Sequence, residues 1–371
     1  MRIAFDSNVF TLQKYGGVSR YLVRLGEELL REGNAVRVFG WLHTNRHLTD
    51  SGMRLTGMRY VKGFPRLTRR MAHHAGDLLG GWEMRRWQPD LIHESFCHAR
   101  RVGPGSVARV CTIHDLIHEL YPEYWGRMDR TPEYRRKTLE RCQAVICVSE
   151  STRRDLLRLV DVDPAKVHVV HHGFDHISAA GGLSPAEEVE LAAVVRAPYL
   201  LYVGARYCYK NFQGFLRGLA HSSVRREFRV VAFGGGAWTR VESDLINQLG
   251  FSEGEVVQLG GSDALLHKLF LRATAFVYPS IYEGFGFPPL EAMARGCPVI
   301  ASNASSMPEV IGNAAEFFDP SDIHAIGDAL EAVVTSRERR EELVKCGYER
   351  LQAFSWGKCA SETMDVYQSV M

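Results

Sequence analysis

The chain has 371 residues, of which 46% are hydrophobic and 24% are charged. This length is more than one hydrophobic core usually serves, so we expect two domains in an ordinary globular protein. No run approaches the roughly 18 apolar residues of a membrane span, which excludes a membrane-spanning helix. The net charge is +2, but residues 1–175 hold 28 Lys+Arg and 20 Asp+Glu, whereas the remainder holds 17 and 23. A basic first half favours an anionic membrane surface or a phosphorylated substrate as its partner.

The start of the chain and the cysteines indicate where the protein is located. The first residues, MRIAFDSN, are too short and too acidic a segment for a signal peptide. The cysteines lack paired metal-ligand spacing, so we expect buried free thiols in a reducing cytoplasm. They stand at positions 97, 111, 142, 147, 208, 297, 346 and 359. We therefore predict a cytoplasmic protein, with peripheral contact at the inner face of the membrane left open.

The chain opens with a strand, a loop, a helix and a second strand. Residues 2–7 and 35–41 have strand patterns, and residues 18–31 have helical periodicity. Gly16 and Gly17 precede that helix, but their spacing is not that of a dinucleotide-binding loop. A turn that lets the helix begin and a close backbone approach to a diphosphate remain equally open at this point.

A second helix is predicted over residues 66–87. Its apolar residues at helical spacing are Leu67, Met71, Ala75, Leu78, Leu79 and Trp82. Arginines occupy its other faces, at positions 66, 69, 70, 85 and 86. We expect the apolar stripe to pack on a sheet, as is usual for such a helix. The alternative is that this basic amphipathic helix lies on an anionic membrane.

The rest of the first half continues the same alternation. Strands are predicted at residues 90–94, 108–114, 144–148 and 167–171, with helices at 132–141 and, capped by Ser149, up to 160. His114 comes at the carboxyl end of its strand, where ligands bind in open α/β sheets. Asp161 and Asp163 precede Pro164, and we interpret them as a turn rather than a metal-binding pair.

Strands and helices alternate again from residue 199. Strands are predicted at residues 199–204, 228–233, 256–259, 275–279, 298–301 and 315–318. The segment 177–198 has little strand pattern, and its residues SPAEEVELAAVV suit one short helix. The three glycines from Gly234 to Gly236 lack the Lys-Ser/Thr of a phosphate-binding loop, so we interpret them as a tight strand exit. Alternating strands and helices predict two mostly parallel, helix-covered sheets, an α/β fold.

The segment 278–301 reads as strand end, glycine loop, helix and strand. Gly284 and Gly286 lie in its loop, and two prolines suit the first helical turn. A helix start with freed N–H groups attracts anions. Two acids, Glu283 in the loop and Glu291 in the predicted first helical turn, therefore indicate binding of sugar or ribose hydroxyls.

Two cations follow the first strand of the second domain. Arg206 and Lys210 are separated by Tyr207, Cys208 and Tyr209. Fixed cations at a strand end can neutralise a diphosphate without a metal. A solvated loop charge is the ordinary alternative for either residue alone.

The motif EGFGFPPLE, with seven residues between Glu283 and Glu291, resembles the E-x7-E motif of retaining GT-B glycosyltransferases, above all family 4. Further similar pieces are Gly16-Gly17, TIHDL around His114, SES at 149–151, HHG at 171–173, VGAR…KN at 203–211, VVQLGG at 256–261 and the segment ending in Glu309-Val310. The resemblance therefore covers nearly the whole chain. The stretch TIHDLIHELYPEYW is most similar to bacterial mannosyltransferases that build surface polysaccharide.

The resemblance implies a GT-B fold with two Rossmann-like domains facing a central cleft. Residues 1–176 would form the acceptor-side domain, 177–198 a linker and 199–354 the domain that binds the nucleotide sugar. Residues 355–371 would form a helix that crosses back to the first domain.

The resemblance also implies roles for individual residues. Glu291 would bind the ribose, and the backbone near Leu259 would meet the base. Glu283 and the N–H groups of Gly284, Phe285 and Gly286 would hold the donor sugar. Arg206 and Lys210 would take the diphosphate, which Gly16 or Gly17 would let the first domain approach. His114 would contact the sugar near its anomeric carbon. Tyr207, Cys208 and Tyr209 depart from the family pattern. The resemblance therefore does not predict the shape of the loop that holds them.

The expected activity is retaining, metal-independent transfer of a hexose to a glycan or lipid-linked acceptor. Cations and helix-start N–H groups would stabilise the charge that leaves with the diphosphate. No metal site, no cofactor beyond the donor and no nucleic-acid partner are expected. GDP-mannose or a related GDP-hexose is the first candidate donor, in polysaccharide or O-antigen synthesis. A UDP-sugar donor, or a sugar-nucleotide epimerase on the same fold, is the alternative.

Overall fold

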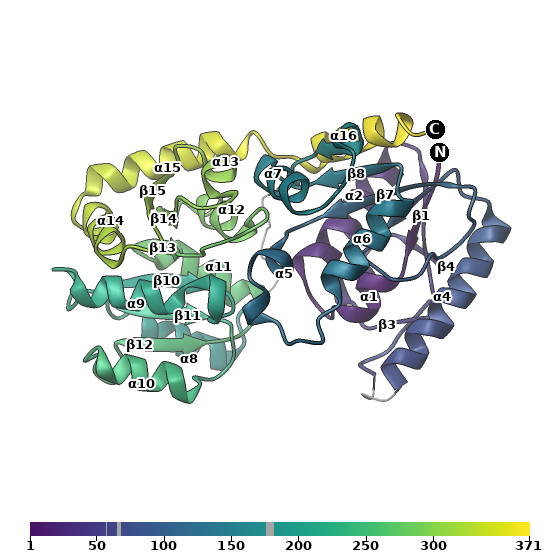
Figure 1. Cartoon of the computed structure of the whole chain (residues 1–371). Coiled ribbons are helices and arrows are strands. Elements are labelled where there is room, and N and C mark those ends of the chain that lie inside the picture. Colours follow the sequence, from purple (N-terminus) through teal and green to yellow (C-terminus); the bar gives the residue numbers. More distant parts are fainter. Residues whose placement is uncertain (57, 65–67, 176–181) are drawn as a thin grey trace. The chain divides into compact units, whose positions relative to one another are not determined.

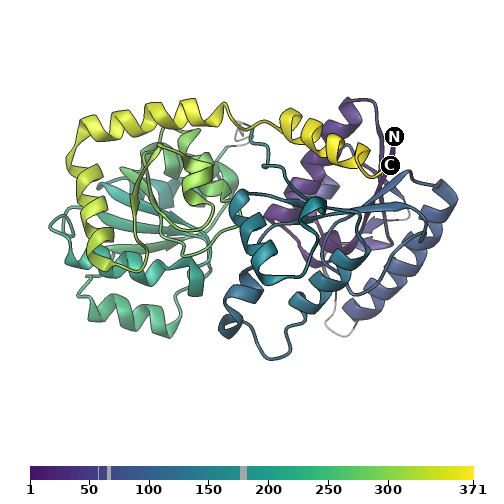
Figure 2. The same cartoon turned by 45° about the horizontal axis from the view of Figure 1, so that its top comes forward.

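The computed structural model describes residues 1–56, 58–64, 68–175 and 182–371. By its internal contacts the chain divides into unit 1, residues 1–173 with 354–371, and unit 2, residues 174–353. Figures 1 and 2 draw the whole chain, with both chain ends in unit 1. Residues 65–67, where the second predicted helix was expected to begin, and residues 177–181 of the predicted linker lie outside the described part.

Unit 1 is built on a parallel sheet with the strand order β4-β2-β1-β6-β7-β8-β9. Its strands are β1 (Arg2–Asp6), β2 (Ala35–Phe39), β4 (Arg54–Thr56), β6 (Leu91–Glu94), β7 (Ala108–Ile113), β8 (Ala144–Cys147) and β9 (Val167–Val169). A small pair is formed by β3 (Leu42–His43) and β5 (Arg59–Tyr60). Both faces of a parallel sheet need cover, and the helices that follow the strands provide it.

The helices of unit 1 include four longer ones that the sequence predicted. These are α2 (Gly17–Arg31), α4 (Thr68–Trp87), α6 (Thr131–Arg141) and α7 (Glu150–Leu159), and Ser149 caps α7 through the Thr152 N–H. The shorter segments are α1 (Asn8–Leu12), α3 (Arg46–Thr49), α5 (Ile117–Leu120), η1 (Pro122–Tyr124) and η2 (Pro164–Lys166). The chain's last helix, α16 (Trp356–Gln368), packs on α2 and β8.

Helix α4 differs from the expectation that its apolar stripe packs on the sheet. Met71, Leu78 and Trp82 are 71%, 72% and 50% exposed. The buried side of the helix instead follows an i, i+4 row of mostly small residues: Ala72, Gly76, Gly80 and Met84. That prediction was wrong because small residues allow a closer approach to the sheet than large ones, and hydrophobic periodicity does not register glycine.

Unit 2 has a second parallel sheet with the strand order β12-β11-β10-β13-β14-β15. The strands are β10 (Tyr199–Val203), β11 (Arg229–Phe233), β12 (Val256–Leu259), β13 (Ala275–Tyr278), β14 (Val299–Ser302) and β15 (Ala315–Phe318). The helices are α8 (Pro185–Val194), η3 (Cys208–Lys210), α9 (Phe212–His221), α10 (Arg240–Gln248), α11 (Asp263–Arg272), α12 (Phe287–Met293), α13 (Met307–Ile311), α14 (Ile323–Thr335) and α15 (Arg337–Leu351). Every strand predicted for this half is present, within two residues of its predicted bounds. No helix of the described residues has the length and apolarity that crossing a bilayer requires.

Candidate active site

Both sheets reverse their strand order at one point, where binding sites form in open α/β folds. In unit 2 the chain runs from β10 outward to β12 and then returns to β13, the other neighbour of β10. In unit 1 it runs from β1 outward to β4 and returns to β6, the other neighbour of β1. The carboxyl ends of β10 and β13, and of β1 and β6, are therefore the two switch points.

The switch point of unit 2 brings Lys210 and Glu283 together. Lys210 follows β10 and Glu283 follows β13, and the Lys210 Nζ lies 2.6 Å from the Glu283 Oε1. The ammonium also lies 5.2 Å and 5.8 Å from the ring centroids of Tyr209 and Tyr278. Burial, and next the neighbouring Glu283 carboxylate, raise the pKa of Tyr278 well above its usual value. The arrangement therefore holds one cation and one anion beside the neutral phenol of Tyr278.

Backbone contacts fix the loop that carries Glu283. The Glu283 N–H donates to Ser305 Oγ at 2.9 Å, and the Ser306 hydroxyl donates to the carbonyls of Glu283 and Phe285. Gly286 has φ +95°, and a Cβ there would stand 2.6 Å from Met307 Cε. Only glycine meets both the backbone angle and the space. The loop geometry is thus set by contacts between two segments, residues 283–286 and 305–307, before any substrate contributes.

Helix α12 begins at Phe287, with Gly286 as its N-cap. Glu291 is therefore in the second helical turn, and the prediction that it stands in the first turn was wrong. The prediction counted from the prolines, whereas the helix already starts at the residue before them. Glu291 remains partly exposed, and its carbonyl accepts from Arg295 Nη1 at 2.7 Å.

Arg206 is buried within the fold of unit 2. It is 5% exposed, its Nε donates to Glu242 Oε1 at 2.8 Å, and the guanidinium lies 4.4 Å from the Trp238 ring centroid. Its terminal nitrogens donate to the carbonyls of Gly234, Gly236 and Ala237. Burial works to raise the pKa of Glu242, but the bonds from Arg206 and Thr239 outweigh it and lower that pKa. Arg206 therefore anchors the loop after β11.

That loop confirms the interpretation of the three glycines as a strand exit. Gly234, Gly235 and Gly236 all have positive φ, from +73° to +95°, directly after β11. A Cβ on Gly235 would stand 2.5 Å from Arg206 Nη1. The carbonyls of this loop are therefore turned toward the arginine.

Leu259 ends β12 beside this loop. Its carbonyl accepts from the Gly234 N–H and from Gln258 Nε2, each at 2.8 Å.

The loop after β10, which carries Lys210, has a local cause for its shape. Cys208 and Asn211 in this loop adopt left-handed φ angles of +49° and +53°. Of the residues that depart from the family pattern, Tyr207 precedes the 3₁₀ turn η3 as its N-cap, and Cys208 and Tyr209 form that turn together with Lys210.

In unit 1, the predicted residues lie after β1 and β7. Gly16 is the N-cap of α2, whose Ser19 N–H donates to the Gln13 side chain at 3.3 Å. A Cβ on Gly17 would meet nothing within 4 Å, so this position is open to a close approach. His114 directly follows β7 and stacks with His172 at 5.4 Å between ring centroids. Burial lowers the pKa of His114 to about 4, so its imidazole is neutral at neutral pH.

Comparison with known proteins identifies the chain. A model described as Glycosyltransferase Family 4 matches residues 15–177, and one described as Glycosyl transferases group 1 matches residues 185–350. The O-antigen chain mannosyltransferase B of Escherichia coli is 30% identical over 273 residues, 70% of this chain and 70% of that protein. The chain belongs to the GT-B glycosyltransferases of family 4.

Two further similarities agree with this glycosyltransferase family. An MMP alpha-(1->4)-mannosyltransferase of Mycolicibacterium hassiacum is 26% identical over 335 residues, 84% of this chain and 77% of that protein. The solved structure of a sucrose-phosphate synthase from Thermosynechococcus elongatus superposes with a TM-score of 0.73 at 19% identity, over 99% of this chain and 98% of that one. The second similarity bears on the fold alone.

Sequence reasoning missed a buried polar chain in the glycosyltransferase's unit 1. His93 is fully buried on β6, with Nδ1 2.6 Å from the Tyr367 hydroxyl and Nε2 3.0 Å from Thr112 Oγ1. Thr112 Oγ1 also lies 3.1 Å from the Tyr21 hydroxyl. These residues come from β6, β7, α2 and α16, so the only sequence signal was a histidine inside an apolar strand. Burial, and next the neighbouring His114, lower the pKa of His93 to about 3.

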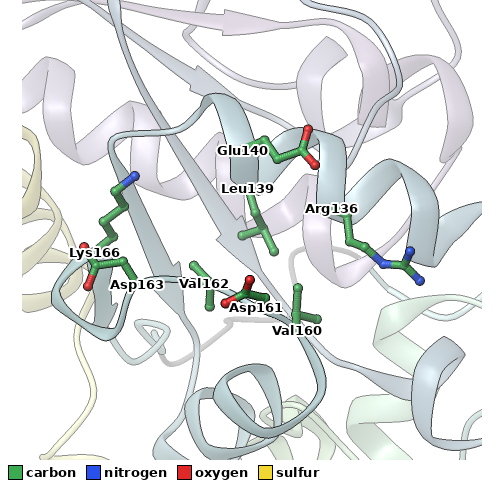
Figure 3. A pocket seen from close by; sticks show the side chains of 8 residues that line it. All are labelled: Arg136, Leu139, Glu140, Val160, Asp161, Val162, Asp163 and Lys166. Carbon is green, nitrogen blue, oxygen red and sulfur yellow. The ribbon is translucent and has the colours of Figure 1, made fainter.

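A pocket of about 300 Å³ lies elsewhere in unit 1 (Figure 3). It is lined by Arg136, Leu139, Glu140, Val160, Asp161, Val162, Asp163 and Lys166. These residues precede β8 and β9, so the pocket is at the amino ends of the strands, opposite to the switch-point edge. Asp163 accepts from the Ala165 N–H at 3.0 Å and caps η2, which confirms the predicted turn.

Proposed function

We propose that this glycosyltransferase moves a hexose from a nucleotide sugar to a glycan or lipid-linked acceptor in bacterial polysaccharide synthesis, with retention of configuration. The observation that carries the proposal is the Lys210–Glu283 pair at the switch point of unit 2. A cation there suits a diphosphate, and a carboxylate suits the hydroxyls of a sugar. The similarity to the O-antigen mannosyltransferase supports mannose, and GDP-mannose or a related GDP-hexose, as the donor.

In this proposal Lys210 stabilises the negative charge that leaves with the diphosphate. Glu283 and the N–H groups of Gly284, Phe285 and Gly286 hold the donor sugar, while Glu291 binds the ribose and the backbone at Leu259 meets the base. The burial of Arg206 supports a positioning role for it, through the loop that it anchors. Preorganised charge of this kind lowers the barrier because no rearrangement is needed during the reaction.

The neutral state of His114 supports a hydrogen-bonding role in unit 1. A neutral imidazole can donate to or accept from a hydroxyl near the anomeric carbon, and it adds no positive charge beside an oxocarbenium-like centre. Gly17 leaves room for the backbone to approach the donor diphosphate, with Gly16 setting the helix start. We propose that the leaving phosphate helps to deprotonate the acceptor, so that the step requires neither an enzymic nucleophile nor a metal ion.

The exposed face of α4 supports contact with an anionic membrane surface. Met71, Leu78, Leu79 and Trp82 are exposed, and the Arg86 guanidinium lies 4.8 Å from the Trp82 ring centroid. Apolar residues with adjacent arginines match an interface of acyl chains and anionic headgroups. Binding to phosphatidylglycerol vesicles should exceed binding to phosphatidylcholine vesicles. The variant L78E/W82E should lose it, whereas Leu271→Glu, at another exposed leucine, should keep it.

The decisive experiment on the donor is a thermal-shift screen of GDP, UDP, ADP and their sugars. A ligand at 100 times its dissociation constant stabilises the protein by about 2.7 kcal/mol. We expect GDP and GDP-mannose to give the largest thermal shifts. In a separate activity assay with EDTA present, we expect product to form and to keep the anomeric configuration of the donor. A preference for UDP would replace the GDP donor with a UDP-sugar. Conversion of the nucleotide sugar alone into an epimer would replace transfer with epimerisation.

A further inference from the structure

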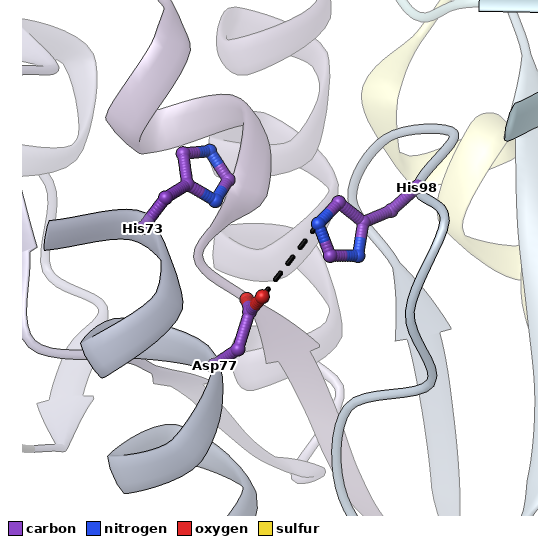
Figure 4. A group of neighbouring side chains, drawn as sticks. All are labelled: His73, Asp77 and His98. Carbon is purple, nitrogen blue, oxygen red and sulfur yellow. Dashed lines mark ion pairs between the residues drawn. The ribbon is translucent and has the colours of Figure 1, made fainter. Parts of the chain in front are cut away.

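Three side chains of unit 1 with metal-binding atoms converge outside the residues proposed for glycosyl transfer. His73 and Asp77 lie one turn apart on α4, and His98 faces them from the loop after β6 (Figure 4). One ligand atom of each residue lies within 4.8 Å of the others. The His98 Nε2 is 3.6 Å from the Asp77 Oδ2, and the two imidazole rings are stacked at 5.8 Å.

The carboxylate of this cluster is buried without adequate compensation. The Asp77 side chain is only 9% exposed, and its Oδ2 has no hydrogen-bond partner among the described residues. Leaving a carboxylate oxygen buried and unsatisfied is costly, so a cation is the natural partner for it. The pKa of Asp77 rises to about 6, chiefly through burial, with His98 acting in the opposite direction.

The outer contacts of His98 orient one of its nitrogens toward Asp77. Its Nδ1 lies 3.0 Å from the Arg100 carbonyl and 3.2 Å from the Arg100 N–H. When Nδ1 carries the proton and donates to the carbonyl, the Nε2 lone pair faces Asp77 and is available to a metal. This backbone carbonyl contact is the usual outer partner of a metal-binding histidine. The opposite tautomer instead places a proton on Nε2, between the histidine and the carboxylate.

We propose that His73, Asp77 and His98 bind a divalent transition-metal ion, with zinc as the best match. Two imidazoles and one carboxylate are a ligand set that zinc accepts, leaving a fourth position for water. Zinc bonds of about 2.0–2.2 Å bring tetrahedral ligand atoms to roughly 3.3 Å from one another. The three side chains therefore draw together around the ion from separations of up to 4.8 Å.

The position of the cluster gives the ion a structural role. α4 packs on β2 and β1 through its row of small residues, and the His98 loop leaves β6, the neighbour of β1. A bound ion would therefore join α4 to the switch-point loop of unit 1. His73, Asp77 and His98 are not among the residues proposed for sugar transfer, so zinc binding can be tested separately from that activity. No metal site was expected from the sequence, because the cysteines lack paired metal-ligand spacing and no carboxylate pair suited a metal. The His-x3-Asp spacing on α4 completes a site only with a residue 21 positions further on.

Zinc binding can be measured on the full chain without any sugar-transfer assay. The metal-free protein, without an affinity tag, is titrated with Zn²⁺ against a chromophoric chelator, and Co²⁺ is added separately to record its visible absorption. We expect one tight site per chain and the intense absorption of tetrahedral Co²⁺. Asp77→Asn and His98→Gln should each weaken zinc binding by at least the roughly 10–100-fold that loss of an outer partner costs.

A matched control stands beside the cluster on the same helix. His74 is exposed and is not part of the group, so His74→Gln should keep the wild-type affinity. Circular dichroism establishes that each variant is folded, and His73→Gln provides a third, independent ligand removal. The proposal is overturned if the wild-type chain binds no stoichiometric zinc, or if folded Asp77 and His98 variants bind it as tightly as wild type does.

Discussion

The two units share a switch-point topology but differ in the other polar residues that lie on or after their strands. In unit 2, charged groups are paired: Lys210 with Glu283, and Arg206 with Glu242. Each pair joins the loop after one strand to the segment after another. Charge is therefore fixed in place where we propose that the diphosphate and sugar bind.

In unit 1 the switch point is ionic as well, because Glu94 at the end of β6 pairs with Arg109 at 2.9 Å and with Arg141 at 2.6 Å. The unit differs in its buried, uncharged histidines, which lie on β6 and after β7 and β9. Burial lowers the pKa of His93, His114 and His172 below the usual value, so these rings are neutral at neutral pH. His114 stacks with His172, and both rings contact the Tyr21 ring. His93 is linked to Tyr21 through Thr112, whose Oγ1 lies 3.0 Å from His93 Nε2 and 3.1 Å from the Tyr21 hydroxyl. The comparison teaches that the fold specifies where a site lies, whereas the residues that follow each strand decide whether its electrostatics are ionic or neutral.

The largest expected effect comes from removing the charge of Glu283. Glu283→Gln keeps the shape of the side chain but removes the carboxylate that pairs with Lys210. Because we assign preorganised charge to this pair, kcat/KM should fall about 10²–10³-fold. Initial rates with the donor found by thermal shift measure this.

Glu316→Gln is the matched control for that variant. Glu316 lies on β15 and pairs with Arg339 at 2.8 Å, away from the switch point of unit 2. The Glu316→Gln variant should therefore keep near-wild-type activity. Near-full activity of Glu283→Gln would remove Glu283 from the proposed machinery.

The second prediction tests whether the ionic character of unit 2 is structural. The Arg206 and Glu242 side chains are 2% and 9% exposed, so Arg206→Met leaves a buried, unpaired carboxylate. Losing one partner of a buried pair costs about 3–5 kcal/mol. Arg240→Met removes an exposed partner of Asp244 on the same helix and should cost about 0–1 kcal/mol. Urea unfolding measures both, and equal costs would contradict the burial argument.

The third prediction concerns acid, which should weaken unit 1 more than unit 2. A histidine whose pKa is lowered in the folded protein binds fewer protons when folded than when unfolded. Its contribution to the free energy of unfolding is therefore fully present above about pH 6.5. For His114 this stability is lost as the pH falls from 6.5 to about 4. Each such histidine contributes a slope of at most about 1.4 kcal/mol per pH unit. Asp77, whose pKa is raised, works in the opposite direction, but it is one group against four histidines, because burial lowers the pKa of His43 as well.

Amide hydrogen exchange can follow the two units separately in one experiment. On lowering the pH through this window, protection should fall in β6, β7 and β8 before it falls in β10 and β13. His267 is the residue of unit 2 to watch, since its pKa is also lowered, but its partial burial makes the effect smaller. Equal loss of protection in both sheets would show that the histidines do not distinguish the units.

The sequence predicts most strands of both sheets because buried parallel strands are short, continuous apolar runs. It missed β4, a three-residue edge strand, and the small pair of β3 and β5. It also predicts that Lys210 and Glu283 lie at strand ends, but not that they touch. That contact depends on β10 and β13 being neighbours, and on the left-handed angles at Cys208 and Asn211. Strand order and turn geometry are tertiary properties, so the residues of the pair could be found and their distance could not.

Arg206 is a second residue whose contacts could not be predicted from the sequence. A cation after a strand suggests an anion site, and only the structure reveals that its donors are used by Glu242 and the loop carbonyls. The chain of His93, Thr112 and Tyr21 was missed because its members are far apart in sequence. Residues brought together from different elements give no local pattern to detect.

The smallest effect is expected at Gly80, which tests how α4 lies on unit 1. A Cβ at Gly80 would stand 3.1 Å from the carbonyl carbon and oxygen of Phe39, and backbone cannot easily move aside. Gly80→Ala should therefore destabilise the protein by about 1–3 kcal/mol, although alanine favours a helix. At Gly357 on α16 nothing lies within 4 Å, so Gly357→Ala should be neutral or slightly stabilising. Urea midpoints of the two variants give the comparison. If both behave alike, the small-residue row of α4 does not press on the sheet, and the exposure of Met71, Leu78 and Trp82 would lose its structural cause.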